Sequence, residues 1–171
     1  MKKIMISFIC LICLAFSTAF ATEFKPYENT SGRYSIDVPT DFAMEPAQGI
    51  TQMVAVNKET GALMSVKVNV MKNGMSQSQQ ESQLKQALPV LVSRLKSQGA
   101  TIMQSRETTV SGCKAICFAY TVERGGVSRY QEQYMILNKG ALYNVTFTAL
   151  SGTGSLYQPV FNHAIKSMVL K

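Results

Sequence analysis

The stretch at residues 130–149 reads YQEQYMIL, NKGA and LYNVTFTA, and it determines much of the fold. Its two outer segments alternate between apolar and polar residues, while the centre holds Asn and Gly, a pattern typical of a β-hairpin. An isolated hairpin is only marginally stable in water, so other strands and helices are expected to cover its apolar face. That face would consist of Tyr130, Glu132, Tyr134, Ile136, Tyr143, Val145 and Phe147.

The beginning of the chain has the features of a secretory signal peptide. Lys2 and Lys3 form a basic start, residues 4–16 form an apolar segment too short for a comfortable membrane span, and an Ala-Phe-Ala sequence ends at Ala21. We therefore expect a signal peptide at residues 1–21 that is cleaved after Ala21. An uncleaved membrane anchor is the alternative. Cleavage predicts a periplasmic or secreted protein, with no transmembrane segment remaining.

The rest of the chain, residues 22–171, has the length of a single domain with an adequate core. The formal net charge of the whole sequence is +7, and removal of the two lysines of the signal peptide lowers it to +5. The basic residues are scattered and form no run, which argues against nucleic-acid binding. No pattern in the sequence indicates a cofactor, and we expect none.

Alternating segments elsewhere in the chain predict further strands. In residues 63–71, Met and Val occupy one face and polar residues around Lys67 the other, which indicates a sheet with one dry and one wetter face. In residues 114–123, large apolar side chains alternate with small ones such as Ala115 and Cys117, so an element could pack closely on this second face as well. The strands predicted outside the hairpin are residues 25–30, 34–38, 52–57, 63–71, 101–110 and 114–123.

The principal helix is predicted from four leucines at helical spacing within residues 84–95. Ser78 with Glu81 matches a capping box, so the helix is expected to begin near these residues. Pro89 lies inside the segment. An interior proline costs about 3 kcal/mol and removes one backbone hydrogen bond, so we expect a kink or a break near residues 86–88.

A second, C-terminal helix is predicted to begin at Ser155 and to carry an apolar stripe as far as Met168. Together, the predicted elements indicate an α+β fold. We expect an antiparallel β-sheet of about six to eight strands with helices packed on its faces, in an α/β/α sandwich.

Two short patterns, one near each end of the predicted domain, match a known family. They comprise Tyr27, Asn29, the segment GRYSIDVPTDF at residues 32–42, the spaced residues Gly140, Tyr143 and Val145, and a closing helix that ends near Ser167. These patterns resemble the PsbP-like fold group. That group includes the extrinsic PsbP subunit of photosystem II, a small Ran-binding import factor and many exported bacterial proteins of unknown role. The resemblance implies an antiparallel sheet with helices on both faces, and it transfers no active site.

The candidate catalytic and metal-binding residues are few. His163 is the single histidine, and nothing in the sequence places it beside a nucleophile and an orienting acid, so we expect no catalytic residues. Asp37, Asp41 and Glu45 form the densest acidic cluster, but their spacing does not match an EF-hand loop. We expect a solvated loop there, and no metal site.

Cys113 and Cys117 are the two cysteines left after signal cleavage, and both would meet an oxidising compartment. Four residues of extended strand span roughly 13 Å, whereas a disulfide requires Cα atoms within about 7 Å. A disulfide would therefore require a bend between them, and two buried free thiols are the alternative. A metal site that uses both thiols is a third interpretation, although this spacing is not typical of zinc.

Two functional hypotheses follow. The preferred one is a non-catalytic exported accessory or binding protein of the cell envelope, which engages an unknown partner through its sheet edge, its loops or a groove between sheet and helix. The alternative is an envelope protein that binds a small molecule, a lipid or a metal, with Cys113 and Cys117 as a redox or ligand pair. An enzyme ranks third, because the sequence contains no catalytic constellation.

Overall fold

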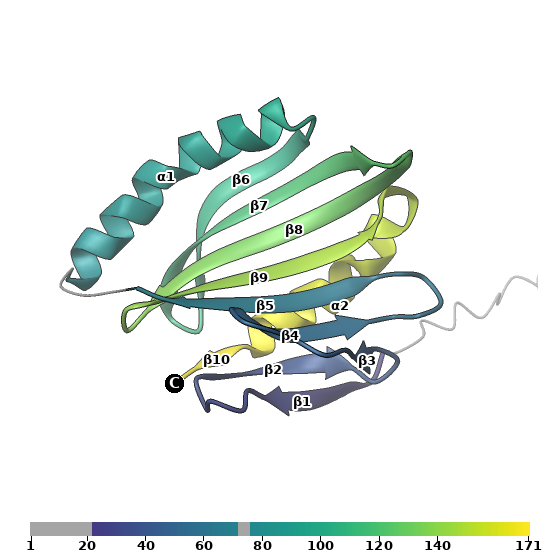
Figure 1. Cartoon of the computed structure of the whole chain (residues 1–171), viewed down its shortest axis with the longest axis horizontal. Coiled ribbons are helices and arrows are strands. Elements are labelled where there is room, and N and C mark those ends of the chain that lie inside the picture. Colours follow the sequence, from purple (N-terminus) through teal and green to yellow (C-terminus); the bar gives the residue numbers. More distant parts are fainter. Residues whose placement is uncertain (1–21, 72–75) are drawn as a thin grey trace, which may run out of the picture.

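The computed structural model describes residues 22–71 and 76–171 (Figure 1). The predicted signal peptide and its cleavage position after Ala21 lie outside the described residues. Within the described part, the fold is α+β, as predicted. It contains a seven-stranded antiparallel sheet, a separate three-stranded antiparallel sheet and two helices packed against them.

The large sheet has the order β3-β4-β5-β9-β8-β7-β6, and every neighbouring pair is antiparallel. The hairpin predicted from residues 130–149 supplies its centre as β8 and β9. In register, Tyr134 lies opposite Val145, and Glu132 lies opposite Phe147. The strands are β3 (Ala43–Met44), β4 (Thr51–Val56), β5 (Leu63–Val70), β6 (Thr101–Val110), β7 (Cys113–Arg124), β8 (Val127–Asn138) and β9 (Ala141–Leu150).

A second, smaller sheet has the order β1-β2-β10. Its strands are β1 (Phe24–Glu28), β2 (Tyr34–Pro39) and β10 (Val169–Leu170), so it joins the two ends of the described chain. The short β3 and β10 escaped prediction because two residues are too few to show a period. β10 pairs with β2 directly after the C-terminal helix, which ties that helix to the start of the domain.

The C-terminal helix α2 (Gly154–Ser167) packs tightly against one face of the large sheet. Phe161 is buried and stacks on Phe147 of β9 with ring centroids 4.8 Å apart. At the first residue of the helix, a Cβ atom on Gly154 would lie 3.0 Å from the side chain of Tyr130, so a larger residue would require Tyr130 to shift. The small residues of β7 face the same side, and Ala115 and Cys117 belong to the core that α2 covers.

The other helix, α1 (Gln77–Ser97), covers the opposite face over β6 and β7 (Figure 1). Its capping box is formed by Ser76 and Gln79, not by Ser78 and Glu81 as predicted, since the helix begins earlier than the leucine period alone indicates. Of the kink or break predicted near residues 86–88, the break does not occur, because α1 is continuous through Pro89, and the kink stays a prediction. Pro89 is exposed, so the carbonyl that loses its backbone donor can be hydrated.

Candidate functional site

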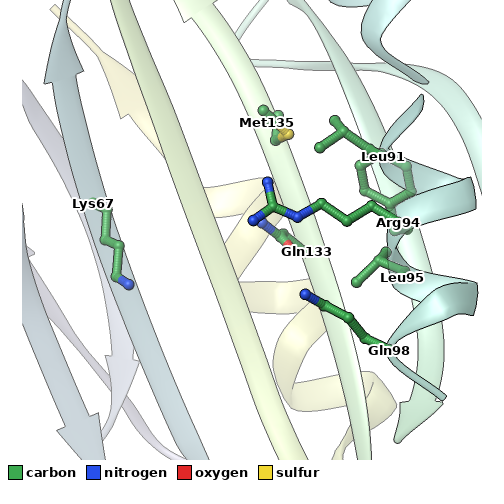
Figure 2. Close-up of a pocket in the computed structure, with 8 residues that line it drawn as sticks. Lys67, Leu91, Arg94, Leu95, Gln98, Gln133 and Met135 are labelled. Carbon is green, nitrogen blue, oxygen red and sulfur yellow. The ribbon is translucent and has the colours of Figure 1, made fainter. Parts of the chain in front are cut away.

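A groove of about 500 Å³ lies between the C-terminal half of α1 and the sheet, and we call it the α1 groove. Its size is within the range of roughly 300–1,000 Å³ that is typical of ligand pockets. Helix α1 supplies three of the lining residues, its C-cap residue Gln98 supplies a fourth, and β5, β7 and β8 supply the others (Figure 2). The lining residues are Lys67, Leu91, Arg94, Leu95, Gln98, Phe118, Gln133 and Met135.

The polar side chains of the α1 groove are basic or amide groups. Figure 2 shows that Arg94 and Gln98 extend from α1 across the sheet in the direction of Lys67 on β5. Gln133, on β8 between them, donates a hydrogen bond to Asn144 at 2.9 Å. No lining residue is acidic, and within the described residues neither Lys67 nor Arg94 forms an ion pair. The groove therefore has an uncompensated positive charge.

The groove exists because α1 packs loosely. Only Gln80 and Leu84 of its side chains are buried, and the leucines that follow along the same stripe are only partly buried. Two ion pairs attach the helix to the sheet, Lys114 to Glu81 at 2.8 Å and Lys85 to Glu107 at 3.4 Å. Both lie in its first half. Exposed ion pairs contribute about 0–1 kcal/mol each, so they hold the second half only weakly.

A second groove, of about 360 Å³, lies where β6 meets the end of α2. Arg106 of β6 and Lys166 of α2 line it together with hydroxyl and amide side chains, among them Thr108 and Asn162. The apolar surface in this groove comes from Val110, Ile165 and the ring of Tyr134. Its volume is smaller than that of the α1 groove, and it borders the tightly packed side of the sheet.

A buried carboxylate lies inside the core under α2. Glu132 is a charged residue, yet it is only 3% exposed, in agreement with its place on the apolar face of the hairpin pattern. Its Oε2 accepts hydrogen bonds from Tyr130 and from Gln158 of α2, both at 3.0 Å, and its Oε1 accepts one from Tyr134. Cys117 Sγ is 3.9 Å from Oε1. Burial of a carboxylate is costly, and these donors replace the water that it loses.

This surrounding changes the acidity of the neighbouring groups. Burial and, to a smaller extent, the nearby Glu132 carboxylate raise the pKa of Cys117 to about 11. For the same two reasons, burial first, the pKa of Tyr130 rises to about 12. Burial and the hydrogen bond to Glu132 also raise the pKa of Tyr134. All three groups are protonated at neutral pH, so they donate to the carboxylate and are poor nucleophiles.

Cys113 and Cys117 both lie in β7 as free thiols, with no bend between them. Cys113 is partly exposed, and burial raises its pKa above the ordinary value for a thiol. No group of three or more His, Cys, Asp or Glu side chains that could hold a metal ion occurs among residues 22–71 and 76–171. The strand geometry therefore favours two separate thiols, and the choice between free thiols and a disulfide is left to measurement in solution.

His163 is half-exposed on α2 and belongs to a local contact between the helix and the small sheet. Its Nε2 lies 2.9 Å from Asp37 Oδ2 of β2, and its ring stacks on Phe24 of β1. Ser167 is one turn further along α2, but its hydroxyl donates to the Ala164 carbonyl and accepts from the Asp37 backbone amide. The histidine and the hydroxyl are thus not hydrogen-bonded to each other, as a nucleophile and its base would be.

The acidic cluster predicted as a solvated loop is divided among three separate partners. Asp37 contacts His163, Asp41 accepts a hydrogen bond from Asn57, and Glu45 forms an ion pair with Lys58. None of the three carboxylates lines either groove. Each carboxylate thus serves a local contact.

The lining of the α1 groove could not be found from the sequence. The wetter face of residues 63–71 correctly placed Lys67 on the side opposite the core. The leucine period correctly placed Leu91 and Leu95 on the side of α1 that faces the sheet. Nothing in the sequence indicated that Arg94 and Lys67, 27 positions apart, line one groove. The sequence placed Glu132 on the apolar face between Tyr130 and Tyr134, but it did not indicate that both tyrosines and Gln158 would donate hydrogen bonds to its carboxylate.

These features define a class of α+β protein in which an antiparallel sheet carries a tightly packed helix on one face and a groove beneath a looser helix on the other. A family model described as PsbP matches residues 22–170, and the chain belongs to the PsbP family. The family prediction from the two terminal patterns is therefore confirmed. No curated protein sequence matches the chain. No helix in the described part of the chain is both long and apolar enough to cross a membrane.

Several solved structures share the fold. Cyanobacterial PsbP (CyanoP) from Synechocystis sp. PCC 6803 has a TM-score of 0.65 at 14% identity, covering 91% of this chain and 96% of that one. LpqN, involved in cell envelope biogenesis of Mycobacterium tuberculosis, has a TM-score of 0.63 at 13% identity, with 88% and 92% covered. PA94 from Pseudomonas aeruginosa, a protein of unknown function and putative regulator, has a TM-score of 0.56 at 13% identity, with 87% and 98% covered. Identities this low show a common fold alone.

Proposed function

We propose that this protein is a non-catalytic, exported accessory protein of the cell envelope that acts by binding, and that the α1 groove is its binding site. The observation that carries the proposal is the composition of that groove. It combines apolar side chains with unpaired cations and amides, a mixture typical of a site that binds and orients a ligand. None of the described residues that line it carries a hydroxyl, thiol, imidazole or carboxylate group to act as nucleophile or general acid.

The envelope location has two supports. The residues before Thr22 have the pattern of a cleavable signal peptide. The fold is shared with LpqN, whose description places it in cell envelope biogenesis. A sequence pattern and a shared fold support the location, and a direct experiment tests both location and binding.

The test begins with expression of the full chain in a bacterial host and fractionation of the cells. We expect the periplasmic fraction to contain a protein whose intact mass lacks residues 1–21. Native mass spectrometry and solvent extraction of that protein should reveal a bound compound, which a Leu95→Asn variant loses. Full-length protein confined to the cytoplasm, or a bound compound that survives in the variant, would contradict the proposal.

The same sample answers the question of the thiols. Intact masses measured after alkylation, with and without prior reduction and under denaturing conditions, show whether Cys113 and Cys117 are joined. Because both lie in one extended strand, we expect both to be alkylated without reduction. Alkylation that requires reduction would instead support the disulfide.

A further inference from the structure

We propose that the α1 groove binds a single-chain amphiphile with an anionic head group. This inference rests on the proposed function, because it names the ligand class of the same groove. The head group is defined by its charge, so a fatty-acid carboxylate and a lipid phosphate share the required chemistry.

The apolar half of the groove fits a hydrocarbon chain. Leu91 and Leu95 lie one helical turn apart on α1, so they form a continuous apolar strip along the inner side of the helix. The ring of Phe118 on β7 and the flexible side chain of Met135 on β8 line the same groove from the sheet. The leucines and Met135 are only partly buried, so a chain inserted here would remove apolar surface from water.

The polar half of the groove fits an anion. Arg94 approaches it from the helix and Lys67 from β5, and neither is neutralised by an acid among the described residues. Two glutamates lie on or beside α1, and both are already in ion pairs. Glu81 of α1 pairs with Lys114, and Glu107 of β6 pairs with Lys85. A guanidinium binds carboxylate or phosphate with two parallel hydrogen bonds, which makes Arg94 the expected main contact.

The arrangement of the two halves gives the ligand one orientation. In Figure 2, Leu91 and Leu95 remain beside the helix, whereas Arg94 and Gln98 extend away from it over the sheet. Beyond them, the sheet face over β5 and β9 is polar, with Lys67, Asn144 and Thr146 on the same side. The tail would therefore lie beneath α1 and the head over β5. A volume of about 500 Å³, in the lower half of the usual range for ligand pockets, suits one chain better than two.

The experiment is an isothermal titration of the protein purified after expression of the full chain and stripped of bound lipid. The probes share one chain length and differ in the head: dodecanoate, dodecyl phosphate, neutral dodecyl maltoside and cationic dodecyltrimethylammonium, each below its micelle concentration. We expect both anions to bind at least about tenfold more tightly than the neutral and cationic probes, as a charged hydrogen bond predicts. The ratio between the two anions identifies whether carboxylate or phosphate is preferred.

Variants separate the two halves of the groove. In Lys67→Gln/Arg94→Gln, the affinity for the anions should fall by about tenfold or more, with that for the neutral probe unchanged. Leu95→Asn should weaken all amphiphiles. Lys96→Gln is the matched control, because this exposed cation lies in the same helical turn but does not line the groove. Inorganic phosphate alone should bind weakly, since it lacks the chain.

Each outcome has a distinct meaning. Equal affinity for neutral and anionic chains, lost in Leu95→Asn, would overturn the anionic class and leave the groove as the binding site. Binding of a purified envelope protein in place of any amphiphile, again lost in Leu95→Asn, would overturn the lipid class and keep the proposed function. Absence of any groove-dependent ligand would overturn both. Circular dichroism of every variant must match the wild type, so that a loss of binding is not a loss of folding.

Discussion

The two faces of the large sheet differ in how completely a helix covers them. On the face under α2, Phe161 stacks on Phe147, Ala164 and Ile165 are buried, and even the charged Glu132 is enclosed by hydrogen bonds. On the face under α1, Leu84 is the only leucine of the helix that is buried, and a groove remains. The face under α2 therefore supplies stability. The face under α1 retains exposed apolar surface and unpaired charge, which a ligand could cover with a gain in binding free energy.

The largest expected contrast comes from truncating one apolar side chain on each face. Phe161→Ala should lower the free energy of unfolding by about 4 kcal/mol, since it removes a buried ring and leaves a cavity. Leu91→Ala should cost about 1 kcal/mol, because its side chain is only partly buried. Urea unfolding followed by circular dichroism measures both. Equal losses would show that α1 is as well packed as α2.

Removal of the buried carboxylate tests whether hydrogen bonds hold the α2 face together. Glu132→Ala should cost about 3 kcal/mol, since it leaves the hydroxyls of Tyr130 and Tyr134 buried without an acceptor. Gln131→Ala, at the next position of β8 on the opposite face, is the control and should change stability far less. A cost below about 1 kcal/mol for Glu132→Ala would mean that the network contributes little.

High pH should weaken the same face. The unfolded thiol of Cys117 ionises near pH 9, whereas burial raises its pKa to about 11 in the folded protein. Between these values the unfolded chain gives up a proton that the folded chain keeps, so stability is complete below pH 9 and falls as the pH rises to 11. Two pKa units correspond to a loss of about 2 to 3 kcal/mol. Denaturant midpoints measured at pH 8, 9.5 and 11 should show it.

A Cys117→Ser variant provides the control for that pH dependence, because a serine hydroxyl does not titrate in this range. Its stability should fall less steeply from pH 9 to 11 than that of the wild type. Tyr130, whose pKa burial raises to about 12, should extend the loss in both proteins above pH 10. Identical slopes in the two proteins would show that Cys117 ionises no differently in the folded and unfolded chains.

The smallest effect is expected for the cations of the α1 groove. Lys67→Gln and Arg94→Gln should each change the free energy of unfolding by less than about 0.5 kcal/mol, because both side chains are exposed and form no ion pair among the described residues. Thermal unfolding without ligand measures this. A loss above about 1 kcal/mol would mean that these residues support the fold, and would weaken the contrast between the faces.

The prediction of the fold succeeded where a local period was long enough to be seen. The hairpin at residues 130–149, the strand at residues 101–110 and the two faces of β7 all follow from alternation, and the structure confirms them. The error at the start of α1 arose where two local capping motifs compete and the leucine period does not decide between them. Ser76 with Gln79 caps α1 in place of Ser78 with Glu81, since both pairs fit the same motif.

The candidate site was predicted in part only. The leucine stripe and the polar phase of β5 each appeared in the sequence, but a stripe does not reveal how deeply it will be buried. Leu84 and Leu91 have the same spacing and chemistry, yet one is buried and the other lines a groove. The difference depends on where α1 lies over the sheet. That position depends on contacts with partners distant in the sequence, such as the ion pairs with Glu107 of β6 and Lys114 of β7.

The sequence by itself determined the longer strands, their inner and outer faces, the two helices and the family, because these depend on periods of two and 3.6 residues and on short turn motifs. Only the tertiary structure decided that β5 pairs with β9, that β10 closes a second sheet, and that Lys67 and Arg94 border one groove. Such long-range pairings depend on the packing of the whole chain, and so do the hydrogen bonds that allow Glu132 to be buried. Local patterns carry no information about either.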